Sequence, residues 1–175
     1  MQKYVAFLRA INVGGTKIIK MEDLKRIFTS FGLANVQTYI ATGNVIFETK
    51  AAANLEAKLE SQLETALGYK VELFLRTMQE VTQIASHPPF TPQATETLHV
   101  VFLRKSHSVD KKSEQDLLSL KSEADDFAVN GSEVYNLRRD KDASIFSNNL
   151  IEKILKAPAT TRNWNTVCKI AEKYK

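Results

Sequence analysis

A short hydrophobic segment of this chain occurs twice. Residues 4–10 read YVAFLRA and residues 99–105 read HVVFLRK, so Val, Phe, Leu and Arg recur in the same register. Self-similarity at one long spacing is typical of a single supersecondary unit that is used twice. The repeat therefore predicts an internally duplicated fold, and it constrains the architecture far more than it constrains the chemistry.

The composition is that of a globular chain. Its 175 residues, of which 43% are hydrophobic, are enough for one ordinary domain or two small ones. The N-terminal apolar run is too short for a signal peptide or a membrane span, so we expect a cytoplasmic protein without membrane association. A single cysteine, Cys168, cannot form an intramolecular disulfide, which fits a reducing compartment.

The overall charge gives little information about the partner. The net charge of +4 and the isoelectric point near 9.1 would suit nucleic acid. The basic residues are however spread evenly over both halves of the chain, and they form no basic arm or tail.

The first half has the order β-α-β-β-α-β. Strands are expected at residues 3–9, 36–40, 45–48 and 71–75, helices at 21–31 and over Leu55, Leu59 and Leu63, and a short extra helix at 78–84. This order is that of the ferredoxin-like fold, an antiparallel sheet with two helices on one face.

The second half repeats most of that order. Strands are expected at 98–104, 126–129 and 133–138, with helices at about 109–120 and 150–155. The ending is expected to depart from the repeat, because Thr160, Thr161 and Arg162 lead into a further helix that Thr161 would cap. Three prolines mark the linker between the halves. The predicted domains are 1–86, a Pro-rich linker 87–96, and 97–175.

The predicted fold class is therefore α+β, with two ferredoxin-like βαββα(β) units related by internal duplication and a C-terminal helix. Four motifs carry a family resemblance: YVAFLRAINVGG at 4–15, IKM at 19–21, TGNVIF at 42–47 and ATTRNWNTV at 159–167. Together they resemble the bacterial domain-of-unknown-function family 1697 over nearly the whole chain. The resemblance implies two α+β subdomains. It implies no particular activity, because the function of the family is not established. Ala10 departs from the family, in which a glycine is expected at that strand end.

The loop after the first strand is one candidate anion site. Paired glycines, Gly14 and Gly15, expose backbone N–H groups, and Arg9, Asn12 and Lys17 add polar and cationic side chains before a helix. The pattern is neither a Walker loop nor a dinucleotide fingerprint. The alternative is that the two glycines simply permit a tight turn or a bulge.

The segment Thr42-Gly43-Asn44 is predicted to be a hairpin turn, because Gly and Asn tolerate positive φ. We expect this turn and the Gly-Gly loop to lie at opposite ends of the sheet, so that they would not share one pocket.

The second candidate site is the polar segment 160–166. In the ligand interpretation, Arg162, Asn163 and Asn165 contact a phosphate, a carboxylate or base edges, and Trp164 offers a stacking face. In the structural interpretation, Thr161 caps a helix, Trp164 packs between the subdomains, and the two asparagines close turns.

No catalytic constellation stands out. The three histidines are scattered, and no nucleophile elbow or Cys-His pair is present. The segment 140–144 opens like a calcium loop, but Ile145 and Ile151 stand where a glycine and a glutamate are needed. Neither a metal site nor a cofactor is predicted, and catalytic residues are unknown.

Three functions remain open. The first is a cytoplasmic binding protein for an anionic ligand, either a phosphorylated metabolite or nucleic acid, although the aromatic RNA-binding motif of ferredoxin-like sheets is absent. The second is a metal-independent enzyme that acts on a small substrate in a cleft between the units, with Arg9 or Arg162 as an electrostatic clamp. The third is an assembly module that binds a protein partner or forms a homodimer.

Overall fold

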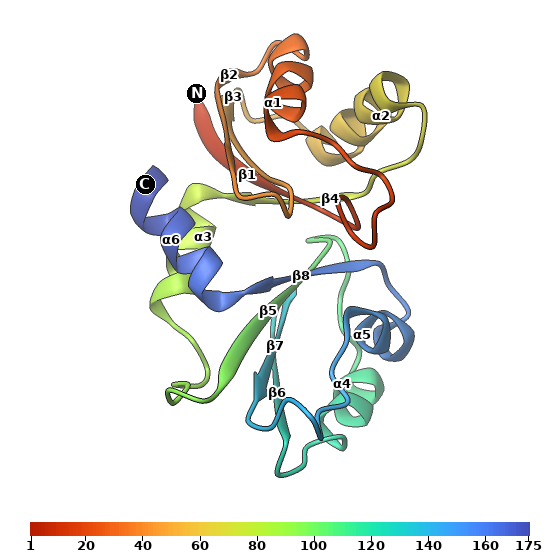
Figure 1. Cartoon of the computed structure of the whole chain (residues 1–175), viewed down its shortest axis with the longest axis vertical. Coiled ribbons are helices and arrows are strands. Elements are labelled where there is room, and N and C mark those ends of the chain that lie inside the picture. Colours follow the sequence, from red (N-terminus) through yellow and green to blue (C-terminus); the bar gives the residue numbers. More distant parts are fainter. The chain divides into compact units, whose positions relative to one another are not determined.

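The computed structural model describes residues 1–175, and it contains the same element order twice (Figure 1). The first series is β1 (Gln2–Leu8), α1 (Met21–Ser30), β2 (Ala34–Tyr39), β3 (Asn44–Thr49), α2 (Leu55–Leu67), β4 (Leu73–Thr77) and α3 (Met78–Ser86). The second series is β5 (Thr97–Leu103), α4 (Lys111–Leu118), β6 (Asp125–Asn130), β7 (Glu133–Arg138), α5 (Asn148–Leu155), β8 (Ala159–Asn163) and α6 (Trp164–Tyr174). Both series read β-α-β-β-α-β-α, which confirms the internal duplication.

Each series forms one four-stranded antiparallel sheet. The strand orders are β2-β3-β1-β4 and β6-β7-β5-β8, which is the ferredoxin-like topology in both cases. The registers match as well. Val5 in β1 pairs with Arg76 in β4, and Val100 in β5 pairs with Arg162 in β8. The α+β prediction of two ferredoxin-like units is therefore confirmed.

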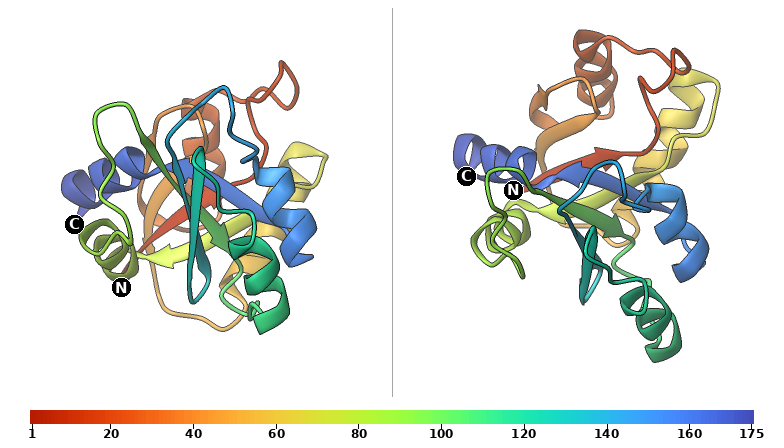
Figure 2. Two further views of the ribbon diagram at one scale, coloured as in Figure 1. Left: turned by 90° about the horizontal axis from the view of Figure 1, so that it is seen from below. Right: turned by 60° about the horizontal axis from the view of Figure 1, so that its bottom comes forward.

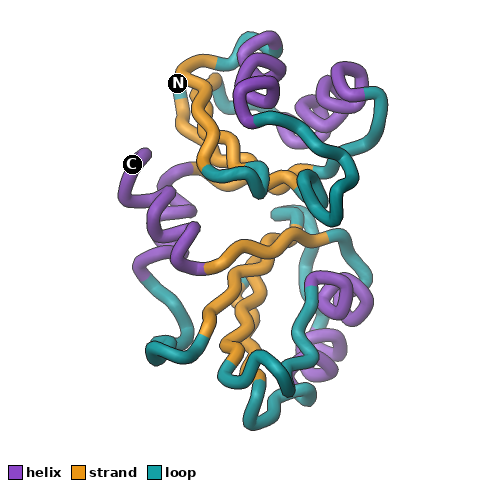
Figure 3. Tube along the Cα trace, in the orientation of Figure 1, coloured by secondary structure: helices purple, strands orange, loops and turns teal.

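The predicted ending of the second half is wrong. Residues 159–163 form the fourth strand, β8, so the repeat is complete rather than interrupted. Thr161 lies inside this strand, and its Oγ1 donates a hydrogen bond to Asn148 Oδ1 at 2.8 Å instead of capping a helix. In Figure 3 the strand colour of β8 passes directly into the helix colour of α6. The same junction joins β4 to α3, so the extra helix of the first half and the C-terminal helix are equivalent elements.

The helix predicted at about 109–120 is shorter in the structure. It runs from Lys111 to Leu118, because Asp110 takes the N-cap position and its carboxylate accepts a hydrogen bond from the Ser113 amide at 2.8 Å. A capped start of this kind fixes the direction in which the preceding loop enters the helix. That loop, 104–110, therefore has a defined path between β5 and α4.

Helices α1 and α2 cover one face of the first sheet, as the views in Figure 2 agree. Leu24 and Phe28 of α1 pack in one cluster with Leu59 and Leu63 of α2 and with Phe47 of the sheet. The rings of Phe28 and Phe47 lie 6.0 Å apart between centroids. Burying each of these side chains contributes about 1.5–3 kcal/mol, which explains the helical spacing of the apolar residues.

Helices α4 and α5 cover one face of the second sheet in the same way. Leu117 of α4 and Ile151 and Leu155 of α5 pack against Val101 and Phe127 of the strands. The two helices contact one another along this face. Each sheet thus has its own helical layer and its own apolar cluster.

The chain divides into two compact units, Met1–Val81 with Tyr174–Lys175 and Thr82–Lys173. The division falls inside α3, and Tyr174, the last residue of α6, groups with the first unit. None of the helices has the length and apolar character needed to cross a membrane.

Candidate functional site

The Gly-Gly segment forms a tight turn on the first unit. Gly14 and Gly15 have φ of 61° and 73°, and the flanking Val13 and Thr16 form a β-bridge. Two successive positive φ values are the requirement of a two-residue hairpin turn. The exposed Lys17 that follows has its Nζ 5.5 Å from the ring centroid of Tyr69. The predicted role of these residues in anion binding stays a prediction, while their role in the turn is observed.

Asn12 uses its whole side chain to hold this loop. Its Nδ2 donates to the carbonyl oxygens of Ile19 at 3.1 Å and Ala41 at 2.9 Å, and its Oδ1 accepts from the Ile19 amide at 2.7 Å. Its φ of 54° is a conformation that asparagine tolerates better than most residues. Asn12 therefore fastens the end of the loop to the β2–β3 turn.

The Gly-Gly loop and the β2–β3 turn lie at the same end of the sheet, so the prediction of opposite ends is wrong. The Leu8 amide donates to the Gly43 carbonyl oxygen at 2.9 Å. The reason is topological: β3 runs antiparallel to β1, so Asn44 at the start of β3 lies opposite Phe7 near the end of β1. The turn before β3 must then lie beside the loop after β1.

The predicted hairpin turn is present, and Asn44 supports it from inside. Asn44 is fully buried, and its Nδ2 donates to the Tyr39 carbonyl oxygen at 2.8 Å and to Thr42 Oγ1 at 3.0 Å. Gly43 has a φ of 87°, and a Cβ at this position would lie 2.6 Å from Ile11 Cδ1. The turn thus needs glycine for both its backbone conformation and its packing.

Arg9, the other predicted residue of this loop, is half-buried. Its backbone amide donates to the Glu72 carbonyl oxygen at 2.9 Å, which extends the pairing of β1 beyond its last strand residue. Arg9 thus lies where the strand ends and the loop begins.

Arg162 is buried within β8 rather than displayed on the surface. Only 6% of the residue is exposed. Its Nη1 donates to Thr160 Oγ1 and to the Thr161 carbonyl oxygen, both at 2.9 Å. Desolvation by burial lowers the pKa of Arg162 to about 10, so the guanidinium remains charged at neutral pH.

Asn163 caps α6. Its Oδ1 accepts a hydrogen bond from the Asn165 amide at 2.9 Å, which is the N-cap interaction. Thr77 has the same place before α3, where its Oγ1 accepts from the Glu80 amide at 3.2 Å and Glu80 Oε2 accepts from the Thr77 amide at 2.7 Å. This reciprocal pair is a capping box. Both repeats therefore turn from strand to helix on a capping residue.

Trp164 and Asn165 line a small hollow in the second unit. The hollow has a volume of about 60 Å³, and Asn163, Glu96 and Pro92 also contribute to its wall. The Trp164 Nε1 is buried and has no hydrogen-bond partner. A hollow of this size holds only one or a few waters, so it is too small for a metabolite.

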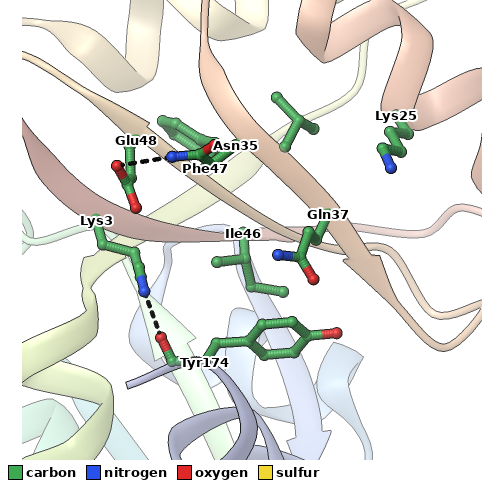
Figure 4. Close-up of a pocket in the computed structure, with 9 residues that line it drawn as sticks. Lys3, Lys25, Asn35, Gln37, Ile46, Phe47, Glu48 and Tyr174 are labelled. Atoms are coloured by element: carbon green, nitrogen blue, oxygen red, sulfur yellow. Dashed lines mark hydrogen bonds between the residues drawn. The ribbon is translucent and has the colours of Figure 1, made fainter.

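A larger pocket lies beside β2 in the first unit, where no sequence motif predicts one. Its volume is about 400 Å³. Figure 4 shows Lys3 and Glu48 on one side, Gln37 and Ile46 above the ring of Tyr174, and Lys25 on α1. The remaining lining residues are Asn35, Val36 and Phe47.

A bulge in β2 shapes this pocket. The register of β2 against β3 shifts between Ala34 and Gln37, and Asn35 has a φ of 51°. Its Nδ2 donates to Glu48 Oε2 at 3.1 Å. A bulge turns a strand locally and redirects its side chains, which is how Asn35, Val36 and Gln37 come to line one hollow in succession. Such a bulge has no reliable sequence signal.

The floor of the pocket is fixed at one point by Lys3. Its Nζ donates to the Tyr174 carbonyl oxygen at 2.8 Å. The Tyr174 ring meets the Tyr39 ring edge-on, with 6.2 Å between centroids, and Tyr174 is 6% exposed. Its ring therefore packs as a wall and does not offer a stacking face.

A network of hydrogen bonds joins Asp125 and His99 of the second unit. The fully buried Asp125 accepts from Asn136 Nδ2 at 2.9 Å, from Ser144 Oγ at 2.7 Å and from the Ile145 amide at 2.9 Å. Asn136 Oδ1 is 3.1 Å from His99 Nδ1. Burial is the main cause that lowers the pKa of His99. This network of hydrogen bonds fastens the loop before α5 to the sheet.

Burial does not activate the thiol of the single cysteine, Cys168, as a nucleophile. It raises the pKa of the Cys168 thiol, whereas reactive cysteines have a lowered pKa.

Comparisons with known proteins agree with this architecture. The family model described as Protein of unknown function (DUF1697) matches residues 1–135. The solved structure of a conserved bacterial protein from Streptococcus pneumoniae is similar, with a TM-score of 0.71 and 22% sequence identity over 99% of both chains. At that identity the likeness shows the fold alone. A search of curated proteins found no match.

Proposed function

For a chain that belongs to DUF1697, a family of proteins of unknown function, we propose the role of a cytoplasmic binding protein for a small anionic ligand. The proposed site is the pocket beside β2. The observation that carries the proposal is the set of side chains that converge there, two lysines and two amides around one hollow.

The charge balance of this pocket favours an anion. Lys3 and Lys25 bring two positive charges, and Glu48 brings one negative charge that already accepts from Asn35. Lys25 and Gln37 are exposed, so their donor groups can reorient toward a ligand. Ammonium and amide N–H groups are the donors that phosphate and carboxylate oxygens accept from.

The size of the pocket favours a metabolite over nucleic acid. A volume of about 400 Å³ lies within the usual range of small-molecule sites. Single-stranded nucleic acid instead needs an extended cationic groove with exposed aromatic faces. The aromatic rings at this pocket, those of Phe47 and Tyr174, are buried, which supports a phosphorylated or carboxylated small molecule as the ligand.

A thermal-shift screen of the full chain tests the proposal, with inorganic phosphate, AMP, citrate and a short single-stranded RNA as probes. A probe at hundredfold excess over its dissociation constant should raise the unfolding midpoint by about 5–10 °C. Lys25→Ala should lower the affinity for that probe by at least about tenfold, which is the effect of losing one charge-assisted hydrogen bond.

The matched control is Lys58→Ala, which removes an equally exposed lysine on α2 that does not line the pocket. Equal affinity losses in the Lys25 and Lys58 variants would mean that the probe responds only to overall charge. Absence of a shift with every probe would reject the proposed class of ligand.

A further inference from the structure

A second cavity lies in the other unit, at the end of the sheet where the loop between β5 and α4 meets the β6–β7 turn. Its volume is about 350 Å³. The polar side chains at its wall are Lys105, Ser106, His107, Ser108, Glu114 and Ser132. The loop itself, residues 104–108, supplies four of these six in consecutive positions.

The internal duplication explains why this end is hollow. The Leu103 amide donates to the Ser132 carbonyl oxygen at 2.9 Å, which repeats the bond from Leu8 to Gly43 in the first unit. The two sheet ends are thus built alike. In the first unit, however, a longer loop runs from β1 to α1, and its Ile11, only 2% exposed, packs against Gly43.

The second unit has no residue in the place of Ile11. Only residues 104–110 connect β5 to α4, and the β6–β7 turn is shortened to two residues. By its equivalent backbone bond Ser132 holds the place of Gly43, and it borders the cavity, whereas a Cβ at Gly43 would collide with Ile11. The space that Ile11 and Asn12 fill in one repeat is therefore left open in the other, and polar side chains surround it.

The loop that borders the cavity is ordered by its own hydrogen bonds. The His107 amide donates to the Arg104 carbonyl oxygen at 2.9 Å, which closes a turn over residues 105 and 106. Beyond it, Asp110 holds Ser113 through both its amide and its hydroxyl, at 2.8 and 3.0 Å. The donors of the loop are thus presented from a fixed frame, which reduces the entropy lost on binding.

The side chains divide into donors and one acceptor. Lys105 carries an ammonium group, and Ser106, His107 and Ser108 add hydroxyl and imidazole groups that suit the oxygens of a phosphate. Glu114, in the first turn of α4, adds a carboxylate, which repels an anion but accepts hydrogen bonds from hydroxyl groups. A ligand that binds both to the donor groups and to the carboxylate must carry a phosphate at one end and hydroxyls at the other.

We propose that this cavity binds a small phosphorylated polyol, with the phosphate at Lys105 and the loop hydroxyls and the polyol hydroxyls at Glu114. The site lies in a different unit from the pocket beside β2, and it does not depend on the function proposed for that pocket.

Isothermal titration of the full chain with ribose 5-phosphate tests the proposal, with inorganic phosphate and ribose as separate arms. Lys105→Ala should weaken ribose 5-phosphate by at least about tenfold. Lys111→Ala removes an exposed lysine outside the cavity, and it should change the affinity by less than about twofold. Equal losses in these two variants, or no binding of ribose 5-phosphate, would overturn the proposal.

Glu114→Gln separates the two halves of the ligand. Loss of the negative charge should strengthen binding of inorganic phosphate, because a repulsion is removed. It should weaken binding of ribose 5-phosphate relative to inorganic phosphate, because charge-assisted bonds to the hydroxyls become the weaker bonds of a neutral amide. The same direction and size of change for both ligands would reject the hydroxyl role of Glu114.

Amide chemical shifts locate the ligand independently of any variant. Ribose 5-phosphate should perturb residues 105–108 and Gly131, and these perturbations should persist in Lys25→Ala, which alters only the other pocket. Perturbations confined to residues outside the cavity would overturn the site.

Discussion

Arg76 and Arg162 occupy the same position in the two sheets, and each donates from Nη1 to the carbonyl oxygen of the preceding residue. The distances are 2.8 Å to Leu75 and 2.9 Å to Thr161. Both arginines are almost fully buried, and each is the last strand residue but one before a capped helix. The duplication has thus kept a buried cation at the junction of strand and helix.

Replacement of the second of these arginines should destabilise the fold. Arg162→Ala removes a buried side chain together with its hydrogen bonds to Thr160 Oγ1 and the Thr161 carbonyl oxygen, so we expect a loss of about 2–4 kcal/mol in the free energy of unfolding. Urea denaturation measures the loss. Arg26→Ala is the control, because Arg26 is an exposed partner of Asp23, and its loss should stay below about 0.5 kcal/mol. If the Arg162→Ala protein were as stable as the control, the guanidinium of Arg162 would make no contribution to the stability of the fold.

The two hairpin turns should respond differently to the same substitution. Gly43→Ala combines a φ of 87° with a Cβ only 2.6 Å from Ile11 Cδ1, and it should cost about 3 kcal/mol. Gly131→Ala has only the backbone strain of its φ of 61°, and it should cost about 1 kcal/mol. Thermal denaturation of both variants gives the comparison. Similar losses would show that Ile11 moves aside without cost.

The side chain of Asn12 should matter more than its backbone conformation. Asn12→Asp tolerates the same φ but removes the two donations from Nδ2, and it should cost about 2–3 kcal/mol. Asn54 also has a positive φ, and its side chain makes no capping bond, so Asn54→Asp is a control that should lose no stability, because a carboxylate is favourable at the N-terminus of α2. Chemical denaturation distinguishes them. A neutral Asn12→Asp would indicate that the loop does not depend on its attachment to the β2–β3 turn.

The cap of α6 should be transferable between similar side chains. Asn163→Ala removes the acceptor of the Asn165 amide, and it should cost about 1 kcal/mol. Asn163→Asp keeps an acceptor at the helix N-terminus, and it should remain within a few tenths of a kcal/mol of the natural protein. Circular dichroism during urea denaturation reports both. A loss in the aspartate variant equal to that in the alanine variant would contradict the capping role.

Acid should destabilise the second unit through His99. Burial, opposed in part by the bond to Asn136, lowers the pKa of His99 below its usual value of 6.5, so the unfolded chain takes up its proton more readily than the folded chain. The stabilising contribution is complete above pH about 6.5 and is lost as pH falls through the lower folded pKa. His99→Gln should flatten the dependence of the unfolding midpoint on pH between about 7 and 5. An unchanged slope would exclude His99 as a source of that dependence.

Much of the fold could be predicted, because the apolar residues recur with clear periods. The first strand, its repeat at β5 and the helical faces of α1 and α5 all follow from hydrophobic spacing. The β2–β3 turn follows from Gly43, since few other residues adopt its backbone conformation. These features depend on local patterns that a sequence displays directly.

Features that depend on pairing could not be predicted in this way. The strand β8 is short and rich in polar residues, so its sequence alone does not separate a strand from a helix entry. Thr161 and Asn163 are both good capping residues, and only the extent of β8 decides between them. The pocket beside β2 depends on a bulge at Asn35, which arises from the register between strands.

The bulge at Asn35 has a consequence for the behaviour of the protein at high concentration. Strand β2 is the outer strand of its sheet, and a flat outer strand invites the addition of a strand from another molecule. A left-handed residue within the strand interrupts the regular row of amides and carbonyls, and the exposed Asn35 and Gln37 make the edge polar. The same irregularity that opens a pocket thus makes this edge a poor template for a strand from another molecule.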